Sequence, residues 1–398
     1  MADLETFRRE TRNWLLANAP KSMSTPLGEG EDVCWGGRKA KYDNPEVKQW
    51  LDIMGARGWT APMWPKEYGG GGLSKDEARI LAQEMDALHL RSPLFGFGLT
   101  MIGPVLLEMG NEQLKRTHIP RIVRGEIRWC QGYSEPGAGS DLASLQTRAV
   151  VDGDYYVING QKIWTSYADK ADWMFLLVRT DPDAPKHRGI TFLLMDMDSP
   201  GVSVKPIRLI SGSSPFCETF MDNVRVPRNQ VVGAVNEGWT VAKRLLGHER
   251  SMIASIGKQL GLSSAKASPV ALAREYLNPD DGRVGDPVLR DRITQVTMDQ
   301  LCLDWTMARA RDTTKAGHSP GAESSIFKYY GTELNKRRRE LMVSILGPQA
   351  LGWEGDGFNS DEITITRDWL RSRGNSIEGG TSEIQLNIIA KQVLGLPD

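Results

Sequence analysis

Hydrophobic periodicity divides the chain into a β-type middle and two helical flanks. Between about residues 130 and 235, β-rich runs such as 173–179 and 190–195 alternate with turn dipeptides. Before residue 130, and again after Gly238, apolar residues recur at helical spacing. This order predicts a multi-domain α+β protein. The expected domains are an N-terminal α-helical domain (1–129), a middle β-barrel or sandwich (130–235) and a C-terminal helical bundle (236–398).

Length, charge and cysteine spacing exclude several classes of protein. A net charge of −1 over 398 residues gives no overall attraction to nucleic acid or to an anionic membrane. No apolar run approaches the roughly 18 residues of a membrane span, and the mixed charges of the N-terminus differ from a secretory signal. The cysteines (Cys34, Cys130, Cys217 and Cys302) lie far apart and the histidines do not cluster. We expect a cytoplasmic protein without metal, nucleic-acid partner or membrane contact.

A glycine-rich polar motif follows the first β-type residues. Residues 131–142 read Q-G-Y-S-E-P-G-A-G-S-D-L. Gly137 and Gly139 leave the backbone free for close approach, and Ser134 and Ser140 add hydroxyls that donate and accept hydrogen bonds. On its own, this motif is better explained as an ordinary glycine-rich loop.

A second motif, V-V-D-G-D-Y-Y-V-I-N-G-Q-K-I-W-T-S, covers residues 150–166. Asp152-Gly153 and Asn159-Gly160 are turn dipeptides, which predict hairpins. Trp164 then stands beside Thr165 and Ser166 at a strand end. A flat aromatic ring next to small hydrogen-bonding groups suits a planar cofactor with polar edges, such as a flavin. The alternative is a buried core tryptophan, but the two motifs in this order are more specific than either alone.

At these motifs the chain resembles the acyl-CoA dehydrogenase family. S-E-P-G-A-G-S-D is similar to the family's T-E-P-x-A-G-S-D, and N-G-Q-K-I-W-T-S to its N-G-x-K-x-W-I-T. The resemblance extends from G-W-T-A-P-M-W-P-K-E-Y-G-G-G-G at 58–72 to G-G-T-S-E-I-Q-L-N-I-I-A at 379–390. It implies a helical domain, a β-barrel or sandwich and a four-helix bundle. The chain looks most like bacterial large subunits that act on dicarboxylic (pimeloyl-type), branched or steroid side-chain thioesters.

The resemblance also implies an activity. Family members use FAD to convert an acyl-CoA thioester into a trans-2-enoyl-CoA, as in fatty acid β-oxidation or steroid side-chain degradation. A glutamate removes the α-proton, the hydride passes to flavin N5, and the electrons leave through an electron-transfer flavoprotein. Two alternatives are a flavin-dependent acyl-CoA oxidase and a non-catalytic subunit of a heteromeric dehydrogenase.

Glu249 is the candidate base that the residues themselves indicate. It lies on the apolar stripe that Leu245, Met252 and Ile256 mark after Gly238. An inward-facing carboxylate either forms an ion pair or carries a pKa that burial raises toward neutrality, as a general base requires. An internal ion pair, for example with the neighbouring Arg250, therefore explains it as well.

The resemblance favours the catalytic reading of Glu249. Many family members carry the base in a C-terminal E-G-T motif, but this chain reads I-E-G-G-T, with Gly379 in that place and Glu378 one residue earlier. Other members, the isovaleryl type among them, take the base from an L-x-x-E-R-like motif, which L-G-H-E-R at 246–250 matches. We expect Glu249 to be the base, with Glu378 as the second candidate.

Further site residues follow from the same motifs. Ser134 and Ser166 match hydroxyls at the flavin ring and Trp164 matches the residue that flanks it. Arg250 matches an arginine near CoA. The full expectation for FAD is Gln131, Tyr133, Ser134, Ser140, Trp164, Thr165, Ser166, Thr381 and Glu383; for the substrate it is Ser140, Arg250 and Gly379.

One departure from the family predicts a partner. In family homotetramers a neighbouring subunit contributes R-x-x-F-G, a later glutamine and a Q-x-x-G-G-x-G loop to each FAD. Here Asp281 replaces the arginine, Arg292 stands near the expected glutamine, and Ser344 and Pro348 interrupt the loop. Because an aspartate repels a pyrophosphate, we expect a small homologous subunit to donate these contacts in an α2β2 assembly. The alternative is a homo-oligomer that grips FAD differently, for example through Arg283.

Overall fold

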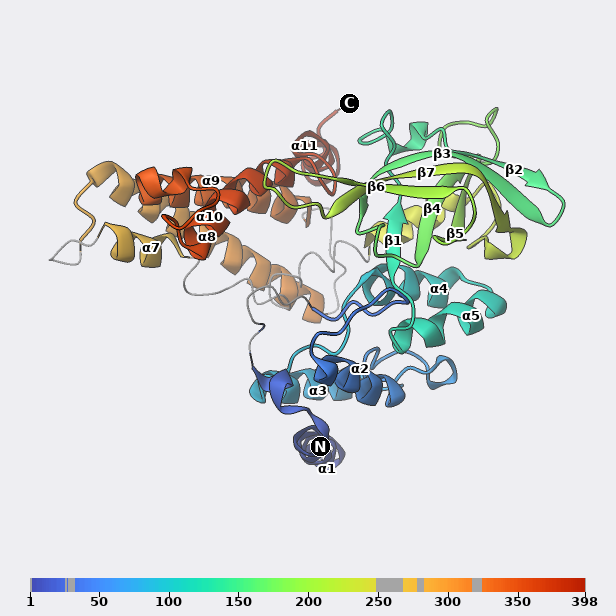
Figure 1. The fold of residues 1–398 in the computed structure, drawn as a ribbon, viewed down its shortest axis with the longest axis horizontal. Coiled ribbons are helices and arrows are strands. Elements are labelled where there is room, and N and C mark those ends of the chain that lie inside the picture. Colours follow the sequence, from blue (N-terminus) through green and yellow to red (C-terminus); the bar gives the residue numbers. More distant parts are fainter. Residues whose placement is uncertain are drawn as a thin grey trace. The chain divides into compact units, whose positions relative to one another are not determined.

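The computed structural model describes residues 2–25, 27, 33–247, 268–277, 283–316 and 324–397. The chain divides into two compact units (Figure 1). Unit 1 contains Met1–Ile207 and Pro215–Leu262, and unit 2 contains Arg208–Ser214 and Ser263–Asp398. Three residues singled out by the sequence, Glu249, Arg250 and Asp281, lie outside the described residues.

The first part of unit 1 is helical, as the periodicity predicts. Side-chain caps start several of its helices: Asn44 and Asn111 accept the amides of Glu46 and Leu114. Ser74 and Glu77 form a capping box at the start of a third helix. The helices are α1 (Ala2–Asn18), α2 (Pro45–Ala56), α3 (Lys75–Ala87), α4 (Gly103–Met109) and α5 (Glu112–Val123).

The middle of the chain forms one seven-stranded sheet with the order β1-β4-β2-β3-β7-β6, and β5 pairs with β4. The strands are β1 (Trp129–Gly132), β2 (Arg148–Asp152), β3 (Tyr155–Ser166), β4 (Trp173–Arg179), β5 (Ile190–Asp196), β6 (Val202–Ile207) and β7 (Phe216–Pro227). β1 and β2 run parallel to β4, and the other pairs are antiparallel. The expected barrel or sandwich is thus realised as a single sheet.

The two predicted turn dipeptides have different outcomes. Gly153 adopts φ +58° in the turn between β2 and β3, which confirms that hairpin. The prediction of a turn at Asn159-Gly160 is wrong, because β3 continues through it with a register shift against β7. Gly160, at φ +154°, is needed for packing, since a Cβ there would lie 2.6 Å from the Thr147 hydroxyl.

Separate apolar cores cover the two faces of the sheet. On one face, Ile102, Leu106 and Ile119 of the helical part pack with Phe175 and Phe192 of the strands. The helical backbone over residues 238–247 adds further side chains to this core. A second cluster on the sheet contains Tyr156, Met174 and Leu193. Because β4 and β5 are buried on both faces, their sequences are almost continuously apolar.

Unit 2 is a helical bundle built around α9 (Ser324–Leu346), which contacts each of the other helices named next. These are α7 (Pro269–Tyr276), α8 (Pro287–Lys315), α10 (Ser360–Ser372) and α11 (Ser382–Ile388). Leu272, Leu334, Leu341 and Ile345 form part of its core. The helical C-terminal part that the periodicity predicts is therefore present. The proposed boundaries at 129/130 and 235/236 stay predictions.

Within the described ranges, no helix is long and apolar enough to cross a membrane. The same part of the chain contains no group of at least three His, Cys, Asp or Glu side chains arranged to hold a metal ion.

Candidate active site

Trp164 lies on a bulge near the end of β3. The pairing of β3 with β7 shifts register between Lys162 and Thr165, and Trp164 adopts φ +61° inside that shift. Its side chain is 53% exposed, with the Phe216 ring edge-on at 6.1 Å. A large apolar ring that is half open to solvent offers a flat face to a planar ligand.

The two residues after Trp164 point in different directions. Thr165 is fully buried, where its hydroxyl donates to the Cys217 carbonyl at 2.8 Å and pairs with the Thr219 hydroxyl at 2.9 Å. Its side chain is therefore occupied inside the sheet, and only its backbone is available to a cofactor. Ser166 is half-buried at the strand end, so its hydroxyl remains the polar group beside the indole.

The glycine-rich loop offers backbone to an approaching ligand. A Cβ placed on Gly137 or Gly139 would meet nothing within 4 Å, so both glycines face open space. Ser140 is exposed and Ser134 half-buried. The Ser134 carbonyl accepts the amide of Ile163 at 2.9 Å, and this bond fixes the loop beside the residue that precedes Trp164.

A buried ion pair also holds this loop. The Lys162 ammonium lies 2.7 Å from Glu135 Oε1 and 3.2 Å from the Tyr133 carbonyl. Glu135 accepts the amides of Gln146 and Thr147 at 2.6 and 2.9 Å. Burial lowers the pKa of Lys162 to about 8 against the opposing effect of Glu135. Burial acts to raise the pKa of Glu135, but the charge and hydrogen bond of Lys162 prevail and lower it.

The side chains of Tyr133 and Gln131 differ in burial. The ring of Tyr133 is buried in the core, edge-on to Phe175 at 6.1 Å and to Phe192 at 6.3 Å. Gln131 is half-buried in β1, in register with Phe175. A cofactor role of Tyr133 would use its peptide groups, because its ring belongs to the core.

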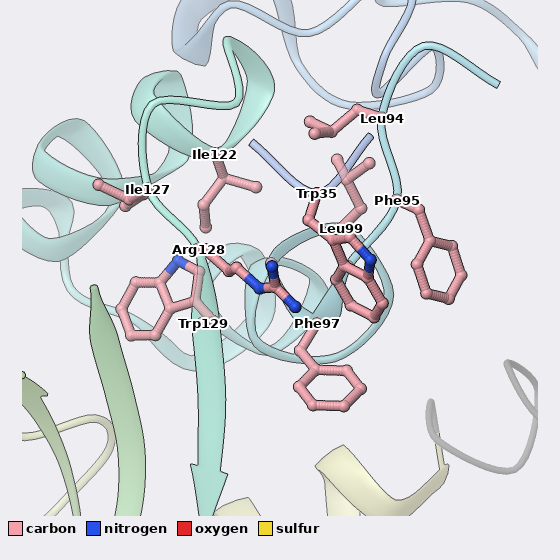
Figure 2. Close-up of a pocket in the computed structure, with 11 residues that line it drawn as sticks. Trp35, Leu94, Phe95, Phe97, Leu99, Ile122, Ile127, Arg128 and Trp129 are labelled. Atoms are coloured by element: carbon pink, nitrogen blue, oxygen red, sulfur yellow. The ribbon is translucent and has the colours of Figure 1, made fainter. Parts of the chain in front are cut away.

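A narrow pocket in unit 1 was not predicted from the sequence (Figure 2). It is a gap of about 10 Å³, room for one water-sized group, between aromatic residues that include Trp35 and Phe97 and the start of β1. The Arg128 guanidinium lies 4.3 Å from the Trp35 ring and 5.2 Å from the Tyr167 ring, which is cation–π distance. Because Tyr167 follows Ser166 directly, the pocket adjoins the strand end that carries Trp164.

The pocket is anchored by a fully buried carboxylate. Asp172 Oδ2 accepts the backbone amides of Arg38 at 2.9 Å and of Arg128 at 2.7 Å. The Arg38 side chain also bridges Asp172 and Asp196. In the sequence, only C-W-G-G-R at 34–38 hints at this pocket. Its contact residues Arg128 and Asp172 lie about 90 and 134 positions further along the chain, so the spacing of residues does not reveal them.

In unit 2, both oxygens of the second candidate base have partners. Glu378 Oε2 lies 2.6 Å from an Arg371 guanidinium nitrogen, and Oε1 accepts a hydrogen bond from the Asn375 amide at 2.6 Å. Gly379 and Gly380 follow at φ +64° and +89°, and the Gln385 amide donates to the Gly379 carbonyl at 3.4 Å. A carboxylate offers about four lone-pair sites, so these two contacts orient the Glu378 carboxylate without using all of its acceptor capacity.

The C-terminal candidates lie at the start of α11. Thr381 caps the helix by accepting the Ile384 amide at 3.3 Å. Hydrogen bonds from its own backbone and from Thr381 hold the pKa of Glu383 below its usual range. These residues belong to unit 2, and Trp164 to unit 1.

Two departures from the family motifs contact each other in unit 2. The Arg292 guanidinium donates to the Ser344 hydroxyl at 3.3 Å, and Ser344 in turn donates to the Glu340 carbonyl at 2.9 Å. The replacements at these two positions therefore form one local contact between α8 and α9.

Comparisons with known proteins cover the whole chain. Models of the acyl-CoA dehydrogenase N-terminal, middle and C-terminal domains match residues 35–126, 130–224 and 236–394. The acyl-CoA dehydrogenase IpdE1 of Mycobacterium tuberculosis is 36% identical over 404 residues, which is 100% of this chain and 99% of that protein. FadE34 of the same organism is 38% identical over 89% of this chain but 47% of its own length.

Solved structures agree with these matches. The steroid ACAD Tcur3481-Tcur3483 shares 32% identity with a TM-score of 0.73, over 100% of this chain and 98% of that one. A chain of the ChsE4-ChsE5 complex from Mycobacterium tuberculosis shares 30% identity with a TM-score of 0.69, over 100% and 98%. The matches to all three domain models, together with relatives aligned along the full length, establish that the chain belongs to the acyl-CoA dehydrogenase family.

Proposed function

We propose that this acyl-CoA dehydrogenase oxidises an acyl-CoA thioester to its trans-2-enoyl-CoA, with FAD bound against Trp164. FAD is the cofactor that family membership indicates. The observation that carries its placement is the half-exposed indole of Trp164 on the bulge of β3. The Ser166 hydroxyl lies two residues further along the same strand.

The described residues fit such a cofactor. A planar ring needs a flat apolar surface, and the exposed face of Trp164 provides one. The polar edge of the ring needs donors at close range, which the open backbone at Gly137 and Gly139 and the hydroxyl of Ser134 can supply. Thr165 contributes through its backbone, because its hydroxyl is bonded within the sheet.

Catalysis requires the chain to orient the thioester, remove a proton and keep water away. When bound, FAD supplies the acceptor for the hydride that leaves the β-carbon. The chain supplies a carboxylate that accepts the α-proton, and exclusion of water keeps that carboxylate and the ring in a fixed polar environment. Ser140, Arg250 and Gly379 are proposed to contact the substrate.

Glu249 is the proposed base. It lies outside the described residues, so the assignment rests on the sequence. L-G-H-E-R matches the second family arrangement of the base, and Gly379 stands where many family members carry it. Glu378, with Arg371 and Asn375 as partners, stays the second candidate.

A second, small acyl-CoA dehydrogenase-like subunit is the proposed partner, in an α2β2 assembly. Two similar solved structures, Tcur3481-Tcur3483 and ChsE4-ChsE5, are complexes of two different proteins by their titles. In this chain Ser344 replaces the expected glutamine and has no side-chain amide to offer. Its hydroxyl is hydrogen-bonded to Arg292 and to the Glu340 carbonyl. An electron-transfer flavoprotein is the proposed electron acceptor. A homo-oligomer is the alternative assembly.

Two other functions remain to be separated by experiment. A flavin-dependent acyl-CoA oxidase would reoxidise rapidly in air and release peroxide, whereas a dehydrogenase would reoxidise slowly without its acceptor. If the chain is a non-catalytic subunit, the assembly would keep full activity when Glu249 is changed to Gln.

We also propose a cytoplasmic location for the protein.

The test is anaerobic mixing of the FAD-loaded assembly with linear, branched, dicarboxylic and steroid acyl-CoA thioesters. Loss of the visible flavin absorbance, together with a product lighter by two hydrogens, supports the dehydrogenase. If none of the thioesters bleaches the flavin or yields an enoyl product, the proposed function is wrong. The preferred thioester then defines the substrate class.

A further inference from the structure

The buried ammonium of Lys162 has no role in the chemistry proposed above. Lys162 is fully buried, and Glu135 is 7% exposed. An ion pair taken out of water gives up hydration that its mutual attraction only partly repays. This pair also accepts two backbone amides and donates to one carbonyl, so its charges lie where they act on neighbouring peptides.

Lys162 contacts the peptide that joins Tyr133 to Ser134. Its ammonium donates to the Tyr133 carbonyl at 3.2 Å. Among the described residues no peptide bond is cis, and in a trans peptide the carbonyl and the following N–H point in opposite directions. The amide of Ser134 therefore points away from Lys162.

The Ser134 amide is an open donor next to Trp164. The backbone hydrogen bonds of the described residues include none from this amide, and Ser134 is half-buried and not enclosed. Its own carbonyl accepts the amide of Ile163, so the donor is tied to the residue that precedes Trp164. The Ser134 amide and the Trp164 ring therefore lie on two segments that a backbone hydrogen bond joins.

A cation on the carbonyl side of a peptide strengthens the donor on its other side. The positive charge draws electron density toward the carbonyl oxygen, and hydrogen bonds in series polarise one another, most strongly where the surroundings are dry. Glu135 keeps the pair neutral overall and is itself held by the Gln146 and Thr147 amides. The Lys162 ammonium contacts the Tyr133–Ser134 peptide directly, at its carbonyl oxygen.

We propose that Lys162 is a positioning residue for the flavin: it fixes and polarises the Tyr133–Ser134 peptide so that the Ser134 amide donates to an acceptor atom on the polar edge of the ring. Reduction places more negative charge on that edge. A strengthened donor there favours the reduced ring and raises the reduction potential. This inference rests on the proposed function, because it needs FAD to lie against Trp164.

A wild-type measurement tests the contact without any substitution. Tyr133–Ser134 is the only Tyr-Ser step in the sequence, so labelling with carbonyl-¹³C tyrosine and ¹⁵N serine isolates the Ser134 amide by NMR. Adding FAD to the FAD-free assembly is expected to move this resonance downfield, as a new hydrogen bond does. A resonance that stays in place while FAD binds would overturn the inference. An assembly that takes up no FAD would instead refute the proposed function.

Two variants test the role of the charge. Lys162→Met removes the ammonium, and the double variant Lys162→Met/Glu135→Gln also removes the carboxylate that would otherwise be buried alone. Lys205→Met, at an exposed position of β6, is the matched control. The measurements are the unfolding temperature without FAD, the affinity for FAD and the two-electron potential.

A structural role and a positioning role give different results. The double variant is expected to regain most of the unfolding temperature that Lys162→Met loses, but to bind FAD at least tenfold more weakly. Its potential should fall by about 30 mV, the equivalent of a tenfold change in a two-electron equilibrium. Lys205→Met should match the wild type throughout. A folded double variant with wild-type FAD affinity and reduction potential would show that the pair is only a structural contact. If neither variant folds, the NMR shift of the Ser134 amide decides between the two roles.

Discussion

Replacing Trp164 with alanine should weaken FAD binding by an amount that the exposure of the indole sets. A tryptophan side chain can bury roughly 200 Å², and at 53% exposure about 100 Å² of Trp164 remains open to a ligand. A ring on one face covers roughly half of this, which at about 25 cal/mol per Å² contributes about 1.3 kcal/mol. Stacking geometry adds about 0.5–1.5 kcal/mol. The total of about 2 kcal/mol corresponds to roughly 30-fold weaker binding.

The assay is titration of FAD into FAD-free assembly, followed by quenching of flavin fluorescence. Trp164→Phe is the matched control, because it keeps a flat face and, like alanine, must adopt the positive φ of the bulge. It should lose less than about fivefold, since most of the stacked area remains. Thermal unfolding without FAD shows whether either variant disturbs the fold. Equal FAD affinity for wild type and a folded Trp164→Ala would refute the placement of the ring.

Three further predictions concern the base, the assembly and acid stability. Glu249→Gln should keep the visible flavin absorbance but abolish its bleaching by substrate. Glu378→Gln, at a carboxylate that contacts Arg371, should change the bleaching rate less than about tenfold. The opposite pattern would make Glu378 the base. The chain produced alone should hold less than stoichiometric FAD and gain it with a small homologous subunit, and full occupancy of the chain alone would favour a homo-oligomer. Burial lowers the pKa of His118 from 6.5 to about 4, so the unfolded chain takes up this proton first and stability is lost as pH falls from about 6.5 to 4. His118→Phe should remove up to about 1.4 kcal/mol per pH unit from that slope in urea unfolding, and an unchanged slope would contradict the argument.

The order of helical and β-type segments could be predicted from periodicity because it is local. The hairpin at Gly153 needed only a turn dipeptide between two apolar runs. Asn159-Gly160 carried the same signal but lies inside β3, where β7 covers it and Asn159 accepts the amide of Asn223. A tertiary pairing there overrides the turn preference, and no local pattern reports that pairing.

The directions of side chains around Trp164 could not be predicted for a related reason. Alternation along β3 buries Tyr156, Ile158 and Lys162, but the register shift then buries Thr165 and turns Trp164 outward. A bulge adds one residue to the strand and exchanges the two faces beyond it. The motif therefore predicted which residues gather at the strand end, but not that Thr165 faces the sheet interior.

The contacts that the sequence did not predict join distant segments. Trp35 contacts Arg128, and Asp172 binds the backbone amides of Arg38 and Arg128 beside them. Lys162 looks like an ordinary strand lysine until the fold brings Glu135 beneath it. Spacing along the chain carries no information on such pairs.

An experimental structure of the FAD-loaded assembly with a bound acyl-CoA tests the central claim most directly. The account predicts that the isoalloxazine ring lies against the face of Trp164, with the Ser134 amide at its polar edge and the Glu249 carboxylate within hydrogen-bond reach of the α-carbon's proton. A ring bound elsewhere, or a Glu249 carboxylate remote from the thioester, would contradict it.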